Sequence, residues 1–351
     1  MKLEVSLKKQ LGRFSFAADF TAEGRRIGVF GPSGSGKTTL MNLLSGLFRP
    51  DSGFIRLDGE TLFDASRKVH LRPEQRHVGV VFQSSNLFPH MSVRRNLFYG
   101  HRRVAGSRPR IKADDLIDVL NLAPLLDRGV GSLSGGEAKR VALGRTILGN
   151  PRLILMDEPL NGLDDGLKYQ IIPYLKNVFK EFAIPFLFIS HSLNEMQMMA
   201  EQVLEFENGR FRSQTAVDEL ALRCMGSSPA GFMNLLELEE PRSRGELTVY
   251  RWGGQELVLL NGVDPAPGMF ELSSKDITLF KRHPEASSAR NLLHCRVRKL
   301  VEVGSRVGVE LDCMGQSLVG QVVGEAVEEL GLAPGTEVMA AIKASAFRRL
   351  Y

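Results

Sequence analysis

Residues 31–38 read Gly-Pro-Ser-Gly-Ser-Gly-Lys-Thr, the spacing in which backbone N–H groups wrap phosphates. The run 26–30 before this loop is typical of a buried strand, and the run 39–44 after it is typical of a helix start. Such a helix offers unpaired N–H groups and its positive dipole end to an anion. We therefore expect nucleotide phosphates to be bound by Gly31, Pro32, Ser33, Gly34, Ser35, Gly36, Lys37, Thr38 and Thr39. The alternative, a glycine-rich turn with a solvated lysine, becomes remote in view of the later motifs.

An acidic pair follows a second predicted strand. Residues 153–156 are uncharged, too few for a helix and flanked by prolines, which predicts a buried strand that ends at Asp157 and Glu158. In a parallel α/β sheet, ligands collect at the carboxyl ends of the strands. We expect Asp157 to hold Mg²⁺ through water and Glu158 to polarise the attacking water. Without the phosphate loop, a solvated acidic turn would be the better interpretation.

A third strand, predicted at 185–189, delivers His191 to the same sheet edge. A lone histidine is more often structural than catalytic. Because three strand ends converge here, we interpret His191 as a sensor of the γ-phosphate, a donor suited to developing phosphoryl charge.

With Gln83 in the run 81–83 and Leu-Ser-Gly-Gly-Glu at 133–137, these motifs resemble the ABC transporter ATPase family. That family orders its motifs as phosphate loop, glutamine loop, signature, acidic strand, Asp loop and switch histidine. The resemblance covers about residues 1–235. It implies an α/β, P-loop NTPase core of the ABC type that hydrolyses ATP with Mg²⁺ and has a helical lobe at about 86–150.

The resemblance also implies roles for single residues. Glu158, His191, Gln83 and Lys37 would be catalytic; Thr38, Gln83 and Asp157 would hold Mg²⁺; and Phe14 would stack on adenine. The signature residues Ser134, Gly135, Gly136 and Glu137 would close on the γ-phosphate bound by the opposite subunit, so the resemblance implies a homodimer. Asp164 would form the subunit-crossing loop, although many relatives have Ser-Ala where this chain has Asn161 and Gly162.

The segment after Gln83 carries apolar residues, among them Leu87 and Phe88. In the family this surface accepts a short helix of the membrane permease, so we expect two permease subunits to dock near Gln83–Val93. Packing inside the helical lobe is an equally good interpretation, and an exposed Phe88 with polar neighbours would favour docking.

Composition predicts a chain that does not cross the membrane. The apolar runs among the 351 residues are far shorter than the roughly 18 residues that a membrane helix needs, and the start does not resemble a signal peptide. The net charge of +5 comes without interleaved aromatic residues, so we expect no nucleic-acid partner. The three cysteines, Cys224, Cys295 and Cys313, have no ligand spacing and are expected to be reduced structural thiols.

The pattern changes after about residue 234. Short alternating runs at 246–250, 256–260, 296–300 and 307–311 are separated by glycine-rich turns, as in a small β-barrel. An imperfect repeat relates 268–279 to 337–347. We therefore expect an ABC ATPase domain at 1–234, a connecting β segment at 235–286, and at 287–351 a small all-β, OB-like barrel.

Residues 288–291 and 342–345 resemble the two motifs of the molybdate-binding barrel domain. A tetrahedral oxyanion requires a cation and fixed donors, and suitable types are present as Ser288, Arg290, Asn291, Lys343 and Ser345. One departure is that 323–326 lack the usual hydroxyl residues before a short helix. A barrel that serves only dimer contacts and binds no oxyanion is therefore an equally good interpretation.

As a whole, the chain resembles the ATPase subunit of a bacterial molybdate importer. The resemblance implies a peripheral position on the cytoplasmic face of the inner membrane. It also implies an indirect partner, an extracytoplasmic oxyanion-binding protein. An importer ATPase for sulfate, thiosulfate or a sugar is a further alternative, and a non-transport ABC ATPase is a more distant one. The sequence does not distinguish molybdate from tungstate.

Overall fold

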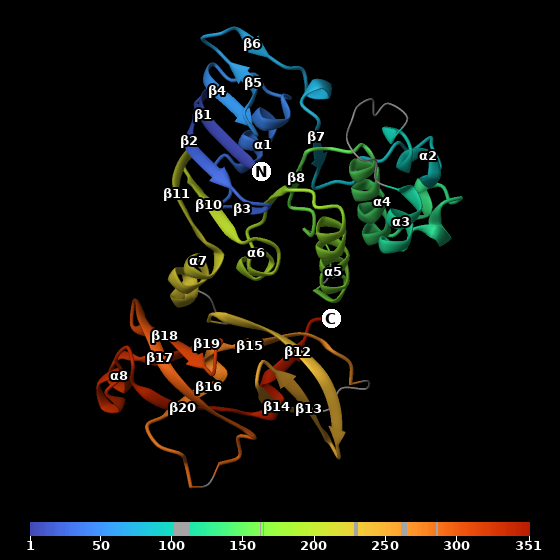
Figure 1. Cartoon of the computed structure of the whole chain (residues 1–351). Coiled ribbons are helices and arrows are strands. Elements are labelled where there is room, and N and C mark those ends of the chain that lie inside the picture. Colours follow the sequence, from blue (N-terminus) through green and yellow to red (C-terminus); the bar gives the residue numbers. More distant parts are fainter. Residues whose placement is uncertain (102–111, 162, 164, 228–230, 261–264, 286) are drawn as a thin grey trace. The chain divides into compact units, whose positions relative to one another are not determined.

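The computed structural model describes residues 1–351 except 102–111, 162, 164, 228–230, 261–264 and 286 (Figure 1). Two compact units are present, Met1–Val217 and Asp218–Tyr351. The division falls earlier than residue 234, where the sequence pattern changes, because Leu222, Met225 and Phe232 pack against Val319 of the second unit.

The first unit is built on an 11-stranded sheet in the order β6-β5-β4-β1-β2-β11-β10-β3-β9-β8-β7. Its parallel part comprises β10 (Gln202–Glu207), β3 (Arg26–Phe30), β9 (Phe186–Ile189), β8 (Leu153–Asp157) and β7 (Val78–Val81). The remaining strands are β1 (Lys2–Leu11), β2 (Phe14–Glu23), β4 (Ser52–Leu57), β5 (Glu60–Asp64), β6 (Val69–His70) and β11 (Arg210–Ala216).

The register of the parallel strands brings the predicted motifs to one edge. Asp157 at the end of β8 pairs with Ile189 at the end of β9, and Ile189 also pairs with Val29 near the end of β3. The chain leaves each of these strands at the same level, since parallel strands share their carboxyl ends. The three strands expected from the apolar runs are thus confirmed.

Helices cover the sheet and form a lobe beside β7 and β8 (Figure 1). The bounds are α1 (Lys37–Ser45), α2 (Val93–Leu97), α3 (Ala113–Val119), α4 (Gly135–Leu148), α5 (Asp165–Glu181), α6 (Leu193–Met199) and α7 (Val217–Cys224). The lobe consists of α2, α3 and α4, within the range of about 86–150 that the family resemblance implies. Helix α1 buries Leu40, Leu43 and Leu44 in the core of the sheet. Among the residues with a described structure, no helix has both the length and the apolar character needed to cross a bilayer.

In its described residues, the second unit consists of β-strands, most of α7, α8 (Gly324–Leu330) and short 3₁₀ turns. One 5-stranded sheet has the order β14-β13-β12-β15-β21, and the other has β16-β20-β17-β18-β19. The strand bounds are β12 (Met233–Arg244), β13 (Leu247–Trp252), β14 (Gln255–Leu260), β15 (Gly268–Ser273), β16 (Ile277–Phe280), β17 (Asn291–Val303), β18 (Arg306–Cys313), β19 (Gln316–Val323), β20 (Glu337–Ile342) and β21 (Phe347–Arg349). These curled sheets agree with the expected OB-like architecture.

The imperfect sequence repeat has a structural counterpart. Each copy is a strand, a 3₁₀ turn and a second strand, namely β15 with β16 and β20 with β21. The copies pair reciprocally, because Leu272 of β15 lies opposite Phe347 of β21 and Ile277 of β16 lies opposite Ile342 of β20. The repeat therefore joins the two sheets of the second unit.

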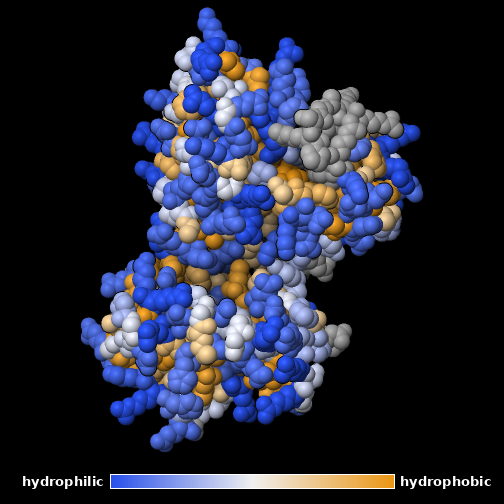
Figure 2. Space-filling view, in the orientation of Figure 1, coloured by the Kyte–Doolittle hydropathy of each residue, from blue (hydrophilic) through white to orange (hydrophobic). Residues whose placement is uncertain are grey.

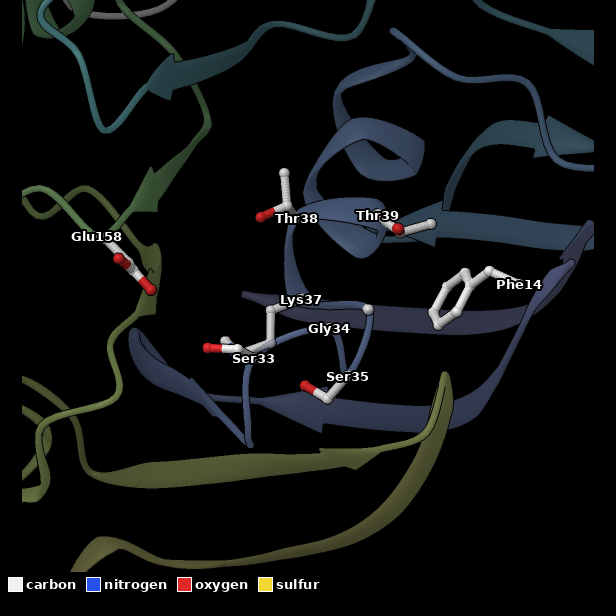
Figure 3. Close-up of a pocket in the computed structure, with 9 residues that line it drawn as sticks. Phe14, Ser33, Gly34, Ser35, Lys37, Thr38, Thr39 and Glu158 are labelled. Carbon is white, nitrogen blue, oxygen red and sulfur yellow. The ribbon is translucent and has the colours of Figure 1, made fainter. Parts of the chain in front are cut away.

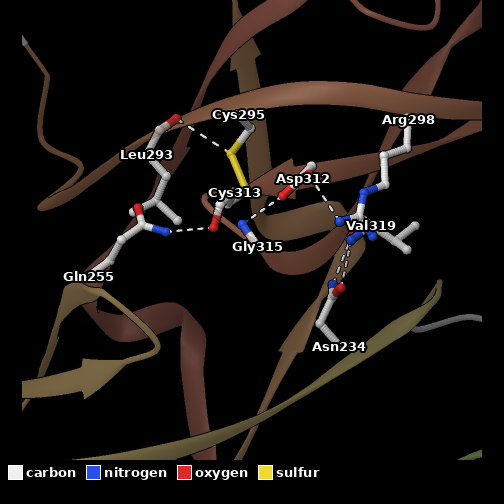
Figure 4. Close-up of a disulfide and its surroundings, with 9 residues drawn as sticks. All are labelled: Asn234, Gln255, Leu293, Cys295, Arg298, Asp312, Cys313, Gly315 and Val319. Atoms are coloured by element: carbon white, nitrogen blue, oxygen red, sulfur yellow. Dashed lines mark hydrogen bonds and ion pairs between the residues drawn. A yellow bond between two sulfur atoms is a disulfide. The ribbon is translucent and has the colours of Figure 1, made fainter.

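The expectation for the cysteines was wrong for one pair. Cys295 on β17 and Cys313 on β18 form a disulfide in the core of the second unit (Figure 4). They are 18 positions apart in the sequence, and they meet only because antiparallel pairing sets Arg296 opposite Asp312. Cys224 forms no disulfide. On the face shown in Figure 2, hydrophilic residues cover most of the surface of each unit.

Candidate active site

The phosphate loop forms one wall of a pocket of about 380 Å³ (Figure 3). The pocket is lined by Phe14, Ser33, Gly34, Ser35, Gly36, Lys37, Thr38, Thr39 and Glu158. Gly36 precedes α1 with a φ of 100°, and a Cβ there would lie 2.8 Å from Phe16 Cδ2, so only glycine fits. In the described part of the chain, the buried Ser35 hydroxyl has no hydrogen-bond partner, which leaves it available to a phosphate oxygen.

Lys37 is buried at the start of α1. Its Nζ donates to Gly31 O at 2.7 Å and to Pro32 O at 2.9 Å, so the ammonium is folded back onto the loop. Burial lowers the pKa of Lys37, while the carboxylates of Glu158 and Asp157 act in the opposite direction. An anion in the pocket would give this ammonium a better partner than two carbonyl groups.

Thr38 connects α1 to the end of β8. Its Oγ1 donates to Asp157 Oδ2 at 3.0 Å, although the two residues are 119 positions apart. Burial raises the pKa of Asp157, and the hydrogen bond from Thr38 partly offsets this rise. A hydroxyl and a carboxylate are the hard oxygen ligands that Mg²⁺ uses together with substrate phosphates, so this pair fits such an ion.

Glu158 lies across the pocket from Phe14 (Figure 3). Its backbone has a φ of 44°, an uncommon conformation for a non-glycine residue, and its N–H donates to Ile189 O at 3.1 Å. Oε1 lies 3.4 Å from His191 Nδ1, which confirms that the ends of β8 and β9 meet. Oε2 accepts from Asn161 Nδ2 at 2.7 Å.

Asn161 is a site residue to which the sequence reasoning assigned no role. The only sequence feature that could have indicated its role is its position three residues after Glu158. In the structure the two residues belong to one turn, in which the backbone N–H of Asn161 donates to Glu158 O at 3.0 Å. A turn of this size brings the side chain of its last residue, Asn161, close to its first residue, Glu158.

Other predicted residues lie outside the pocket wall. Gln83 is exposed after β7 and is not among the residues lining the pocket. The exposed Ser134 and Gly135 do not line it either. Asp164 lies outside the described residues. A single chain therefore brings together the phosphate loop, the acidic strand end and His191, but not the signature.

The signature forms the N-terminus of α4. Ser134 is the N-cap and accepts from Glu137 N at 3.3 Å, while Glu137 Oε2 accepts from Ser134 N at 2.7 Å. This reciprocal pair is a capping box. The Ser134 N–H holds the pKa of Glu137 below its usual value. The box gives the signature a defined conformation before any second subunit approaches.

Phe88 is half-buried rather than exposed. Its ring centroid lies 4.5 Å from that of Tyr99, and the Arg145 guanidinium lies 5.2 Å from it. The exposed aromatic residues of this region are Phe82 and Tyr99. Packing inside the lobe thus buries much of the Phe88 side chain. Phe88 is not the exposed residue that would have favoured permease docking at this position.

The two barrel motifs are neighbours in space. Asn291 at the start of β17 pairs with Ile342 at the end of β20, which places Ser288 and Arg290 in one flanking segment and Lys343 and Ser345 in the other. Those four residues are exposed. Asn291 differs, because its buried amide accepts from Val258 N at 2.6 Å and donates to Val258 O and Ile342 O. It ties the strands together.

The phosphate loop beside the acidic end of β8 defines the class as a P-loop ATPase of the ATP-binding cassette type. Residues 19–161 match the model of the ABC transporter family, and residues 287–347 match that of the TOBE domain. The fold is similar to cbiO1 from Clostridium perfringens, part of the ABC transporter complex cbiONQ, with a TM-score of 0.53 and 24% identity over 62% of this chain and 89% of that chain. A nucleotide-free ATP-binding cassette from an ABC transporter is similar with a TM-score of 0.53 and 25% identity, over 65% and 95% of the two chains.

Curated relatives match almost the whole chain. The Molybdenum import ATP-binding protein ModC of Rhizobium etli is 38% identical over 350 residues, covering 98% of each chain. The protein of the same name from Yersinia pseudotuberculosis is 37% identical over 363 residues, covering 99% of this chain and 98% of that one. The chain therefore belongs to the molybdenum import ATP-binding protein family of ABC transporters and is an ABC ATPase.

Proposed function

We propose that this chain hydrolyses ATP to power molybdate import through a membrane permease, as a homodimer with two composite ATP sites. The contact of Thr38 Oγ1 with Asp157 Oδ2 at 3.0 Å, next to Glu158, is the observation that carries the ATPase role. Molybdate as cargo rests on the names of relatives that match the chain over 98% of its length.

In this proposal the loop 31–39 holds the phosphates through backbone N–H groups, and Phe14 stacks on the adenine. Lys37 leaves its two carbonyl partners for the outer phosphates. Thr38, Asp157 and Gln83 hold Mg²⁺, which when bound neutralises charge on the phosphates. The pocket position of Phe14 and the pairing of Thr38 with Asp157 support these assignments.

Glu158 acts as the base that orients and deprotonates the attacking water, and His191 contacts the γ-phosphate. The distance of 3.4 Å between Glu158 Oε1 and His191 Nδ1 supports the idea that they act on the same group. His191 has an exposed side chain, so it is free to turn toward a phosphate while Glu158 stays in the pocket wall.

The second copy supplies the missing part of each site. Ser134, Gly135, Gly136 and Glu137 of one subunit face the phosphates of the other, and Asp164 contributes to the subunit-crossing loop. The location of the signature outside its own pocket supports this arrangement. Two permease subunits dock near Gln83–Val93 at the cytoplasmic face of the inner membrane, and an extracytoplasmic oxyanion-binding protein feeds them.

The domain plan of the proposal is an ATPase domain at 1–234, a connecting β segment at 235–286 and a barrel at 287–351. Within the barrel, Ser288, Arg290, Lys343 and Ser345 form the candidate oxyanion site, with Asn291 holding its two strands together. The pairing of β17 with β20, which makes the two motifs neighbours, supports this assignment.

Glu158→Gln tests the proposal. The amide cannot accept a proton, so the variant should bind ATP, lose about 10²–10⁴-fold in kcat and accumulate a closed dimer. Steady-state ATPase assays and size-exclusion chromatography with ATP measure this. In a strain lacking the subunit, the unaltered chain should restore molybdate uptake and the variant should not.

Glu181→Gln, at the exposed end of α5, is the matched control and should behave as the unaltered chain. Normal hydrolysis by Glu158→Gln would contradict the assignment of the base. Restored uptake of sulfate in place of molybdate would contradict the assigned cargo.

A further inference from the structure

Asn161 lies between the catalytic carboxylate and the signature helix. Its Nδ2 donates to Glu158 Oε2 at 2.7 Å, the shorter of the two side-chain contacts of that carboxylate in the described structure. The other contact, from Glu158 Oε1 to His191 Nδ1, is 3.4 Å long. Asn161 therefore holds one carboxylate oxygen firmly and leaves the other able to accept from water.

The backbone of Asn161 is held from α4. Lys139 Nζ donates to Asn161 O at 2.7 Å, and Lys139 stands on the same helix whose N-terminus carries Ser134. Burial lowers the pKa of Lys139, and the carboxylate of Glu195 opposes that change. The hydrogen bond from Lys139 therefore links α4 directly to the turn after β8.

We propose that Asn161 is a positioning residue for Glu158 and that Lys139 makes its position depend on the signature helix. The inference rests on the proposed role of Glu158 as base. A glutamate side chain has several accessible rotamers, and a hydrogen bond to one oxygen selects among them. A base that is misplaced by about 1 Å can lose on the order of 10²-fold in rate, so the anchor acts on kcat rather than on ATP affinity.

The contacts from α4 through Lys139 and Asn161 to Glu158 would transmit movements of α4 to the catalytic base. When the signature of one subunit meets nucleotide held by the other, any shift of α4 reaches Asn161 O through Lys139 and then Glu158 through the amide of Asn161. The base of a site would thus be oriented according to whether its own α4 has engaged the partner, and the two ATP sites would be coupled through side chains rather than through the sheet.

Asn161→Asp is the decisive variant for the full-length chain. Aspartate keeps the shape but replaces the donor with a second carboxylate, so kcat for ATP should fall about tenfold while KM stays within about twofold. Asn161→Ala should likewise lower kcat and leave KM nearly unchanged. Asn121→Asp, the same change at an exposed position in the lobe, is the matched control and should leave both parameters unchanged.

Lys139→Met removes the connection to α4. Its kcat should fall about threefold, and its combination with Asn161→Ala should be no slower than Asn161→Ala alone, because the two residues act in series. In the Glu158→Gln background, Asn161→Ala should change the residual kcat by less than about twofold.

Unchanged kcat in Asn161→Asp, with Glu158→Gln inactive, would overturn the inference and leave the proposed function intact. An equal loss from Asn161→Ala with and without Glu158 would also overturn it. Normal hydrolysis by Glu158→Gln would instead refute the role of Glu158 on which the inference rests.

Discussion

Arg76 is a fully buried cation at the C-terminal end of α1. Its guanidinium donates to Leu43 O at 2.7 Å and Leu44 O at 2.9 Å, where the helix dipole is negative. Burial lowers the pKa of Arg76 to about 10, so the group stays charged at neutral pH. A side chain at Gly46 would meet Arg76 Nε at 2.7 Å, so glycine makes room for this cap.

Arg76→Met should lower the free energy of unfolding of the first unit by about 3 kcal/mol. The methionine fills similar volume but leaves two buried carbonyl groups without their charged donor. Calorimetry of the full-length chain measures the change in the melting transition. The exposed Arg49 lies just after α1, and Arg49→Met should shift that transition by no more than about 0.5 kcal/mol. Equal effects of the two variants would contradict the capping role.

At the scale of single residues, the sequence predicted the chemistry of the phosphate loop but not its partners. Lys37 and Thr38 are recognisable because the loop is contiguous in the chain. The role of Arg76 could not be predicted, since nothing in its local sequence shows that the end of α1 lies beside it.

At the scale of elements, α4 serves two purposes. Its N-terminus presents the signature, and the capping box of Ser134 and Glu137 holds that terminus in shape. The pattern of a serine followed three positions later by glutamate was readable in the sequence. The strands that end at Asp157 and Ile189 were also predictable from the sequence, because short apolar runs between prolines or polar residues are characteristic of buried strands.

Ser134→Arg should abolish ATP hydrolysis while the monomer still binds ATP. The arginine removes the N-cap oxygen, which costs about 1 kcal/mol of helix stability, and places a bulky cation where the partner's phosphates would pack. Fluorescent-nucleotide binding and ATPase assays on the same preparation separate the two effects. An ATPase rate equal to that of the unaltered chain would show that the site is not shared between subunits.

At the scale of the whole molecule, the disulfide belongs to the second unit alone. Cys295 and Cys313 join β17 to β18, near the hydrogen bond from Gln255 to Cys313 O (Figure 4). Reduction should destabilise this unit by about 3 kcal/mol, because a loop of this length regains entropy when unfolded. The first unit holds no member of the pair, so its nucleotide site should be unaffected.

Differential scanning calorimetry with and without dithiothreitol measures this prediction. The transition of the second unit should move to lower temperature, and KM for ATP should stay constant. Cys295→Ser should reproduce the effect of reduction, and Cys224→Ser, which leaves the disulfide in place, should not. A KM that changes on reduction would contradict the confinement of the effect to the second unit.

The class of the protein follows from patterns that are visible in the amino-acid sequence. The phosphate loop, the acidic strand end, the signature and the barrel repeat are local patterns, and local spacing carries their chemistry. Contacts between residues that are distant in the chain became visible only in the folded structure. Lys139 meets the turn after β8, Arg76 caps α1, and Cys295 meets Cys313 because strand register and helix packing bring together residues that are far apart in the chain. A local pattern cannot encode such contacts, since they depend on where two separate elements are placed by the core between them.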